Sequence, residues 1–590
     1  MIFRALILVL LAAVSACKSQ RPKARYVVPW GMPDASWSPQ SVASVRGVPV
    51  DTVRAAIADR LEEGAPKPLH ERSWRHVVEL YESYGNSPLW LNENGLRGER
   101  VAALLRALAD ADADALGLSE YPLAALGRAL EKAREPGTLR PDAIANADVL
   151  LTATYAALGE DLLTGQTSPK AMSQDWHIDP YHEDVDSALG GVIRSVALDK
   201  GLAQFRPEDP DYEGMRRYLV RYRELVARGG WTTVPKGRAL RPGEADDPAR
   251  LTALRDRLAV EGFVAADTRI QPAPAMLQVR DSVVPAKPGT ALYDRTLASA
   301  VATYQSRHGI AVDSILGAET VSSMNLPAEY RLEQIAANLE RFRWLPRNLG
   351  ERYLYVNVPA FQLVAFDSGQ QTFEMRVIVG ASVEDRNTPV FSDSMTHVVF
   401  RPYWNVTDDI ANKELWPEIN KDPGYMARND LETWRENGKI RLRQIPGPKN
   451  SLGLVKFMFP NDFNIYLHDT PNDELFKKDV RAFSHGCIRV EKPDVLAQWV
   501  LGWDADKVKE YMEKGRDNRT VNLPAKIPVY IVYFTTYVVN GQLYFGNDLY
   551  KRDATLADAV KEGALPSAEA RRASELLRRM AAAATPAGAD

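Results

Sequence analysis

Within the C-terminal half of this chain lies Ser484-His485-Gly486-Cys487-Ile488-Arg489-Val490, a run that places a thiol two residues after an imidazole. A second histidine lies nineteen residues before the thiol, in Tyr466-Leu467-His468-Asp469-Thr470-Pro471. The whole chain has only 2 cysteines and 8 histidines. This grouping therefore predicts a cysteine nucleophile with its acid and base groups.

Alternating apolar residues surround this motif, and a period of two is typical of strands. The alternation begins after Pro346, and one helix is expected at 494–501. The sequence therefore predicts a mainly-β domain over residues 352–550. Its strands are expected at 353–358, 361–366, 373–379, 396–400, 464–467, 529–538 and 542–545.

A polar segment interrupts the strand pattern at about 405–445. It contains Trp416, Pro417, Gly424 and Trp434. Long insertions into compact sheet domains are usually functional or disordered. We predict a partly helical lid over the active site, and the alternative is that its aromatic residues form a satellite core.

Residues 71–245 are predicted to form an all-α scaffold, because apolar residues recur there at helical spacing. A bridging helical element is expected over 331–351, where Leu345-Pro346 ends the helix because proline cannot continue it. A helical tail is expected over 551–590. His177 and His182 lie among acidic residues, but their spacing fits no standard ligand set, so no metal or cofactor is expected.

Residues 246–330 are predicted to form a three-helix module. Tyr304-Gln305-Ser306-Arg307-His308-Gly309, followed by Asp313 and Leu316-Gly317-Ala318-Glu319-Thr320, resembles the small peptidoglycan-binding domain. We favour this interpretation over a plain helical spacer. His308 is expected to be structural.

The first 16 residues have the layout of a secretory signal, with Arg4, a short apolar run and small residues before Cys17. Val14-Ser15-Ala16-Cys17 resembles a bacterial lipobox, in which the cysteine is lipidated. The alternative is a plain signal peptide with an incidental cysteine. Residues 17–70 are rich in Pro, Ser and Arg, so we expect a tether between the membrane and the first domain.

Lipidation of Cys17 would leave Cys487 as the only free thiol of the mature protein. A lone thiol in an exported protein can oxidise or mispair, so its presence suggests chemistry rather than an inert buried cysteine. The formal net charge is −4. This value argues against a nucleic-acid-binding protein.

The motif His468-x-Thr470-Pro471, followed by Ser484-His485-Gly486-Cys487-Ile488-Arg489, is similar to the signature of the L,D-transpeptidase family (YkuD type), which cross-links bacterial peptidoglycan. The likeness extends to residues 339–346 and the N-terminal helical region, as in the large multidomain branch of that family. It implies an α+β multidomain fold, in which an all-α scaffold and a peptidoglycan-binding-like module precede a mainly-β catalytic domain with an inserted lid.

The resemblance also implies peptidoglycan stem peptides and glycan as partners. It implies a periplasmic protein, lipid-anchored to the outer membrane of a Gram-negative bacterium, since Lys18 and Ser19 resemble the outer-membrane sorting pattern. Other cell-wall synthesis proteins are candidate partners. Cys487 is expected to attack the diaminopimelate of a tetrapeptide stem, release D-Ala as a thioester forms, and pass the acyl group to an amine in a 3→3 cross-link.

Each neighbour of Cys487 has an expected role. His485 lies two residues away, which places both side chains on one side of an extended segment. Some family members use a histidine at that place as the base and others use the equivalent of His468, so both are expected to contribute. Ser484 is expected to orient an imidazole and Gly486 to keep the turn open. Arg489 either binds a substrate carboxylate or forms a structural ion pair.

Three alternatives stay open. A hydrolase of the same fold would use water in place of the amine. A non-catalytic wall-binding lipoprotein would not need the intact Cys487, His485 and His468. A papain-type protease has its cysteine and histidine in the reverse order along the chain.

Overall fold

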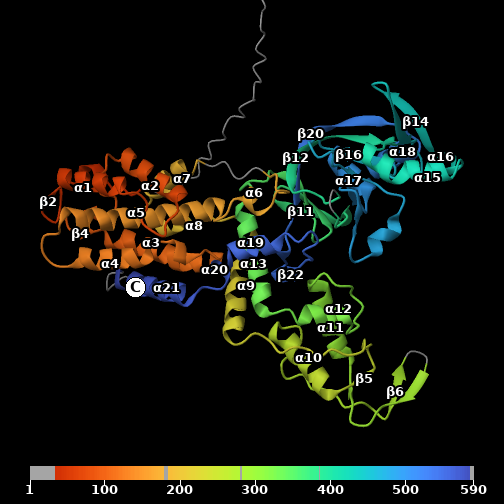
Figure 1. The fold of residues 1–590 in the computed structure, drawn as a ribbon, viewed down its shortest axis with the longest axis horizontal. Coiled ribbons are helices and arrows are strands. Elements are labelled where there is room, and N and C mark those ends of the chain that lie inside the picture. The colour runs from red at the N-terminus through yellow and green to blue at the C-terminus, as the bar shows by residue number, and fades with distance from the viewer. Residues whose placement is uncertain (1–32, 179–183, 280–281, 384–385, 585–590) are drawn as a thin grey trace, which may run out of the picture.

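Three bodies of structure meet at one helix in the computed structural model (Figure 1). The structure describes residues 33–178, 184–279, 282–383 and 386–584. Helix α13 (Ala328–Arg343) lies between the N-terminal helices, the strand-rich domain and a smaller helical module. The predicted α+β class is confirmed, because helices dominate the N-terminal region and strands the C-terminal domain.

The N-terminal body is a bundle around one long helix, α5 (Pro141–Thr164). Its residues are buried almost without interruption from Ala143 to Leu163, as expected for a helix that is apolar on every side. It stops at Gly165, which has a φ of 89°. The surrounding helices are α1 (Val50–Glu62), α2 (Glu71–Ser83), α3 (Gly98–Ala111), α4 (Leu123–Arg134), α6 (Pro169–Met172), α7 (Val185–Val192) and α8 (Leu198–Ala203).

The predicted tether is wrong for the part of 17–70 that the structure describes. Residues 33–62 form a short hairpin, β1 (Ser44–Val45) and β2 (Val48–Pro49), followed by helix α1. Val53 and Ile57 are fully buried in the bundle core, and Trp37 is nearly so. A few spaced apolar residues dock this segment on the N-terminal bundle, although they do not repeat at a regular helical spacing. Residues 17–32 lie outside the described ranges.

The smaller module has three helices, as expected: α10 (Pro248–Val260), α11 (Arg295–Arg307) and α12 (Ala318–Met324). It follows helix α9 (Pro210–Ala227) and carries a hairpin, β6 (Met276–Val279) and β7 (Ser282–Pro285), that was not predicted. His308 is buried, and its ring stacks on Tyr304 at 3.7 Å between centroids. Its Nδ1 also bonds to the Tyr304 carbonyl oxygen at 2.8 Å, so this histidine holds the module's core.

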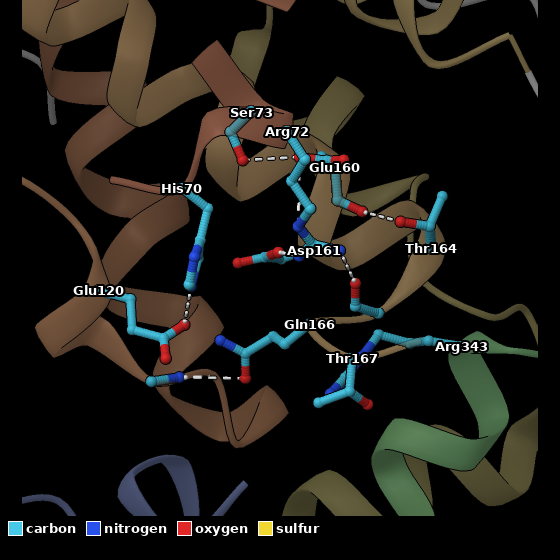
Figure 2. Close-up of polar contacts among 12 residues, drawn as sticks. His70, Arg72, Ser73, Glu120, Glu160, Asp161, Thr164, Gln166, Thr167 and Arg343 are labelled. Atoms are coloured by element: carbon cyan, nitrogen blue, oxygen red, sulfur yellow. Dashed lines mark hydrogen bonds and ion pairs between the residues drawn. The ribbon is translucent and has the colours of Figure 1, made fainter. Parts of the chain in front are cut away.

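A buried network of charges joins the N-terminal bundle to α13. Figure 2 shows its bundle side, where Arg72 and Asp161 lie near Arg343 of α13. Glu340 of α13 accepts hydrogen bonds from the backbone N–H of Thr167 at 2.7 Å and from its hydroxyl at 2.8 Å, and it also pairs with Arg343. A Cβ on Gly165 would lie 2.7 Å from Glu340 Oε1, so only glycine fits there. Beside it Arg72 pairs with Asp161. Both carboxylates of this joint thus have guanidinium partners.

The C-terminal domain is a sheet that closes on itself. Its strands run β10-β9-β20-β12-β16-β17-β19-β11-β18, and an added β10–β11 pairing completes the barrel. These strands are β9 (Arg352–Asn357), β10 (Gln362–Asp367), β11 (Gln370–Gly380), β12 (Phe391–Phe400), β16 (Val455–Met458), β17 (Leu467–His468), β18 (Ala482–Ser484), β19 (Ile488–Val490) and β20 (Arg519–Val532).

Two strand predictions are wrong in detail. Residues 464–466 form a loop, because the Asn461 side chain bonds to the backbone there and Asn464 has a φ of 55°. The strand predicted at 529–538 breaks after Val532, because the side chain of Asn338 accepts the N–H of Thr535. The chain resumes in the hairpin β21 (Thr536–Val539) and β22 (Gln542–Phe545).

The inserted segment at 405–445 is a small unit with its own core. Val406, Ala411 and Leu442 are buried in it, and Trp404 and Trp416 pack against them, as the satellite-core alternative expects. The three-stranded sheet within it was not predicted. Its elements are β13 (Trp404–Asn405), α14 (Asp408–Ile410), a π-helical turn (Ala411–Leu415), α15 (Trp416–Lys421), α16 (Tyr425–Arg428), β14 (Leu431–Glu436) and β15 (Lys439–Gln444).

The C-terminal helices return to the N-terminal bundle (Figure 1). α21 (Ala568–Ala584) packs on α3 and α4, and Leu577 is buried in the bundle core. In the parts of the chain that are described, none of the helices has the length and apolar character that crossing a bilayer requires. The remaining helices are α17 (Pro493–Leu501), α18 (Ala505–Glu513), α19 (Asp553–Ala559) and α20 (Lys561–Ala564).

Candidate active site

Gly486 turns the chain between β18 and β19 and sets Cys487 at the start of β19. Its φ of 113° is one that residues with a side chain rarely adopt. Ser484 Oγ accepts the N–H of Gly486 at 3.1 Å and donates to the carbonyl oxygen of Cys487. The expectation that Ser484 orients an imidazole is therefore wrong, because its hydroxyl holds the turn itself.

Strands β17 and β19 bring the predicted histidine to the strand that neighbours the thiol. They pair in parallel, with Leu467 opposite Ile488 and His468 opposite Arg489. Leu467 and Ile488 are fully buried in the core. Because side chains alternate along a strand, His468 and Arg489 lie on the opposite face.

Tyr466 and Cys487 lie just before these two strands and meet the same face. The Tyr466 ring lies 5.7 Å from the His468 ring, and the Tyr466 side chain hydrogen-bonds to Cys487. The N–H of Ile488 donates to the Tyr466 carbonyl oxygen at 3.1 Å, which fixes the register there. Cys487 is partly exposed, and its Sγ donates to the Asn464 carbonyl oxygen at 3.7 Å. The thiol is thus reachable from outside, whereas the His468 ring is buried.

Burial dominates the electrostatics of the thiol. It raises the pKa of Cys487 to about 11, although hydrogen bonds from Tyr466 and the charges of Arg489 and Lys456 act in the opposite direction. The thiolate is the nucleophilic form of cysteine. The resting site at neutral pH therefore holds a thiol, which needs a base at the moment of attack.

His468 is a buried, neutral imidazole. Its Nδ1 lies 2.6 Å from the Asp469 carbonyl oxygen, which can only accept, so Nδ1 carries the proton. Burial, the charge of Arg489 and the charge of Lys456 lower the pKa of His468 to about 3. Nε2 is therefore the ring nitrogen with the lone pair, and the ring carries no charge at neutral pH.

His485 contacts Glu414 rather than Cys487, beside which it was expected. Its Nε2 lies 2.8 Å from Glu414 Oε1, in the π-helical turn of the inserted segment. Glu414 also pairs with Arg386 at 2.6 Å. Within the described ranges no hydrogen bond joins His485 to Cys487. The predicted same-side arrangement fails because the positive φ of Gly486 breaks the alternation.

The hydrogen bond from His485 affects the carboxylate that it meets. Burial by itself would raise the pKa of Glu414, but the hydrogen bond and the positive charges of His485 and Arg386 lower it below its usual value. Glu414 is therefore ionised at neutral pH. It ties the inserted segment to the loop that holds the thiol.

Arg489 and Lys456 bring positive charge to the face of the thiol. Lys456 of β16 lies opposite His468 in the sheet register. Burial lowers the pKa of both side chains, and the charge of Cys487 acts against that shift. No carboxylate among the described residues pairs with Arg489, and its Nε has no hydrogen-bond partner there. The structural ion pair considered for Arg489 is thus not found in these ranges.

Sequence reasoning missed three residues of this site: Glu414, Lys456 and Thr388. Lys456 could have been found from strand alternation, since it lies on the same face as His468. Glu414 and Thr388 come from a segment and a loop with no motif, and only the fold brings them to the thiol. Among the described residues no group of three potential metal ligands occurs. His177 packs against Phe463 at 4.5 Å, and His182 lies outside the described residues.

A partly exposed thiol and a buried neutral imidazole on neighbouring segments are the groups that cysteine acyl-transfer and hydrolytic enzymes use. Residues 351–531 match the model of the L,D-transpeptidase catalytic domain (YkuD), and residues 75–219 match a scaffold domain. These matches confirm the resemblance: the strand-rich body contains an L,D-transpeptidase catalytic domain.

Two known proteins are similar to parts of the chain. "Putative L,D-transpeptidase" from Haemophilus influenzae is 32% identical over 241 residues, which cover 38% of this chain and 48% of that protein. The match thus spans about half the length of the relative. The crystal structure of an L,D-transpeptidase from Xylanimonas cellulosilytica aligns with 50% of this chain and 99% of that chain, at 14% identity and a TM-score of 0.18, a value too low to bear on the fold.

Proposed function

We propose that this protein is an L,D-transpeptidase that forms 3→3 peptidoglycan cross-links through a thioester on Cys487. The main support is the shared face of β16, β17 and β19, where a thiol, a neutral imidazole and two cations gather. The catalytic-domain match over 351–531 supports the same chemistry. The 3→3 bond and the amine acceptor are inferred from the likeness to the family.

In the first step, Sγ of Cys487 attacks the carbonyl carbon at the L-centre of diaminopimelate in a tetrapeptide stem. The thiol proton passes to Nε2 of His468 as the C–S bond forms, since both groups are neutral at rest. The C–N bond to D-Ala then breaks, and its nitrogen takes that proton from His468. The thioester stays on Cys487, and D-Ala leaves.

In the second step, the side-chain amine of another stem's diaminopimelate attacks the thioester. Nε2 of His468 accepts the amine proton and returns it to the departing sulfur, so the enzyme ends as it began. Arg489 and Lys456 lie where they can pair with the carboxylates of the stems. We assign His468 the role of base in both steps, and His485 a role in holding the lid.

We further propose that segment 405–445 acts as a lid on the donor stem. Its contact with the thiol loop is the pair of Glu414 and His485, a partly exposed contact that can open at modest cost. The separate core of the segment supports movement as a unit. Excluding water from the thioester would favour transfer to an amine over hydrolysis.

The function is tested by incubating the purified protein with disaccharide-tetrapeptides and identifying the products by mass spectrometry. Cross-linked dimers that lack one D-Ala are expected, and Cys487→Ala should make none. Tripeptide monomer without dimers would show the hydrolase of the same fold. No turnover by a folded protein would show a non-catalytic wall-binding protein.

We also propose a periplasmic protein that is anchored to the outer membrane through lipid on Cys17, with the module at 246–330 contacting wall glycan. The lipobox-like Val14-Ser15-Ala16-Cys17 supports the anchor, and it lies outside the described residues. Fractionation of cells tests this. Cys17→Ser should move the protein from the outer-membrane fraction to the soluble periplasmic fraction, and an unchanged distribution would contradict the anchor.

A further inference from the structure

Thr388 is a fully buried residue between β11 and β12 whose hydroxyl reaches the loop of the nucleophile. It lies two residues before Val390, which bonds to the N-terminal bundle through Asp175 and His177. We propose that Thr388 is a positioning residue that aims the N–H of Cys487 at the oxyanion formed during acylation. This inference rests on the proposed function.

The direction of the Thr388 hydroxyl is set by its two neighbours. The N–H of Gly380 donates to Thr388 Oγ1 at 2.9 Å. Oγ1 is therefore the donor in its second hydrogen bond, which goes to the Gly486 carbonyl oxygen at 2.8 Å. This bond fixes the orientation of the peptide group that joins Gly486 to Cys487.

The same peptide group carries the N–H of Cys487. In a trans peptide the C=O and N–H point in opposite directions. Since the carbonyl points to the buried Thr388, the N–H of Cys487 points away from that interior. No described residue accepts a hydrogen bond from it, although buried backbone N–H groups are nearly always paired. An unpaired donor next to the nucleophile is the arrangement that binds a developing oxyanion.

The position of Thr388 is itself firmly held. Gly380 has no room for a side chain, because a Cβ there would lie 2.0 Å from the Arg386 carbonyl oxygen, and this lets the 386–388 loop approach β11. The Thr388 N–H donates to the Tyr550 hydroxyl at 3.2 Å. That hydroxyl donates in turn to the Gly380 carbonyl oxygen at 2.8 Å. Tyr550 thus braces the same loop without touching Gly486.

The test compares two reactions of the same thiol in the purified full-length protein. Acylation by a carbapenem passes through an oxyanion, whereas alkylation by iodoacetamide does not. Thr388→Val removes the hydroxyl, and Thr388→Ser keeps it. Tyr550→Phe is the matched control, since it disturbs the same loop but leaves the bond to Gly486. Both rate constants are followed by intact mass, and folding by circular dichroism.

Thr388→Val should lower the acylation rate constant by at least about tenfold, a part of the ~10²–10³-fold cost of losing an oxyanion donor. Its alkylation rate constant should stay within about twofold of wild type, because alkylation forms no oxyanion that the donor could stabilise. Thr388→Ser and Tyr550→Phe should keep the wild-type ratio of the two rates. Equal losses in both reactions, or no loss in acylation, would overturn the proposal. Failure of the wild type to be acylated would instead count against the proposed function.

Discussion

Glu414 and His485 join the inserted segment to the loop of Cys487 through a contact of 2.8 Å between Oε1 and Nε2. The side chains are 37% and 31% exposed, so water weakens the attraction between them. Arg386 adds a second partner at 2.6 Å. This small polar contact joins the inserted segment, which has its own core, to the Gly486 turn that precedes Cys487.

Glu414→Gln should weaken this contact. We expect turnover of a tetrapeptide donor to fall about two- to fivefold, because an exposed pair contributes at most about 1 kcal/mol. The melting temperature should hardly change, since the segment keeps its own core. Glu418→Gln is the matched control, because the described partner of Glu418 is Lys421 on the same segment. Equal effects of the two variants would argue against a role for the contact in turnover.

The two histidines of the site should differ in their effect on turnover. His468→Gln should lower kcat about 10²–10⁴-fold, the range for loss of a positioned general base. His485→Gln should lower it less than about tenfold, because His485 bonds to Glu414 and not to the thiol. Steady-state kinetics on both variants measure this. A larger loss for His485→Gln would reverse the assignment of the base.

The thiol of the resting enzyme should ionise only at high pH. Burial raises the pKa of Cys487 to about 11, so its thiolate fraction and its alkylation by iodoacetamide should rise with pH above about 9. Arg489→Met should move this rise to higher pH, because the guanidinium charge favours the thiolate. Alkylation rates at a series of pH values measure both. A rise centred below pH 7 would contradict a thiol that is neutral at rest.

The joint between the N-terminal bundle and α13 should depend on Gly165. Gly165→Ala forces a Cβ to 2.7 Å from Glu340 Oε1 and adds the strain of a φ of 89°. Gly369→Ala is the control, since its φ of 74° is similar but nothing lies within 4 Å. We expect Gly369→Ala to lower the free energy of unfolding by about 1–2 kcal/mol, and Gly165→Ala by at least about 1 kcal/mol more. Denaturant unfolding measures the difference, and equal losses would contradict a tight joint.

The sequence predicts β9, β10 and β11 well because their apolar alternation reflects a face buried in the domain's own core. It does not predict β16, β18 or β19, and only Leu467 of β17 lies in an expected strand, because strands of two to four residues are too short to show a period. It predicts Cys487 as a candidate nucleophile because a thiol, a glycine and two histidines fall close together along the chain. These features depend on local order alone.

Other features depend on contacts between distant parts of the chain, which no local pattern encodes. Thr388 lies 98 residues from Gly486, and Glu414 lies 71 residues from His485. The turn at Gly486 also redirects His485 through one backbone angle. The segment at 33–62 looked like a tether because its few apolar residues, such as Val53 and Ile57, find their partners only in the folded bundle.

The central claim is that Cys487 holds the acyl group of the donor stem. Its most direct test is to mix the protein with a tetrapeptide donor in the absence of an acceptor amine, quench within seconds and measure the intact mass. The account predicts a protein heavier by the donor minus D-Ala, with the added mass mapped to Cys487 and removed by hydroxylamine, and no such species for Cys487→Ala. Release of D-Ala with no adduct, or by Cys487→Ala at the wild-type rate, would contradict it.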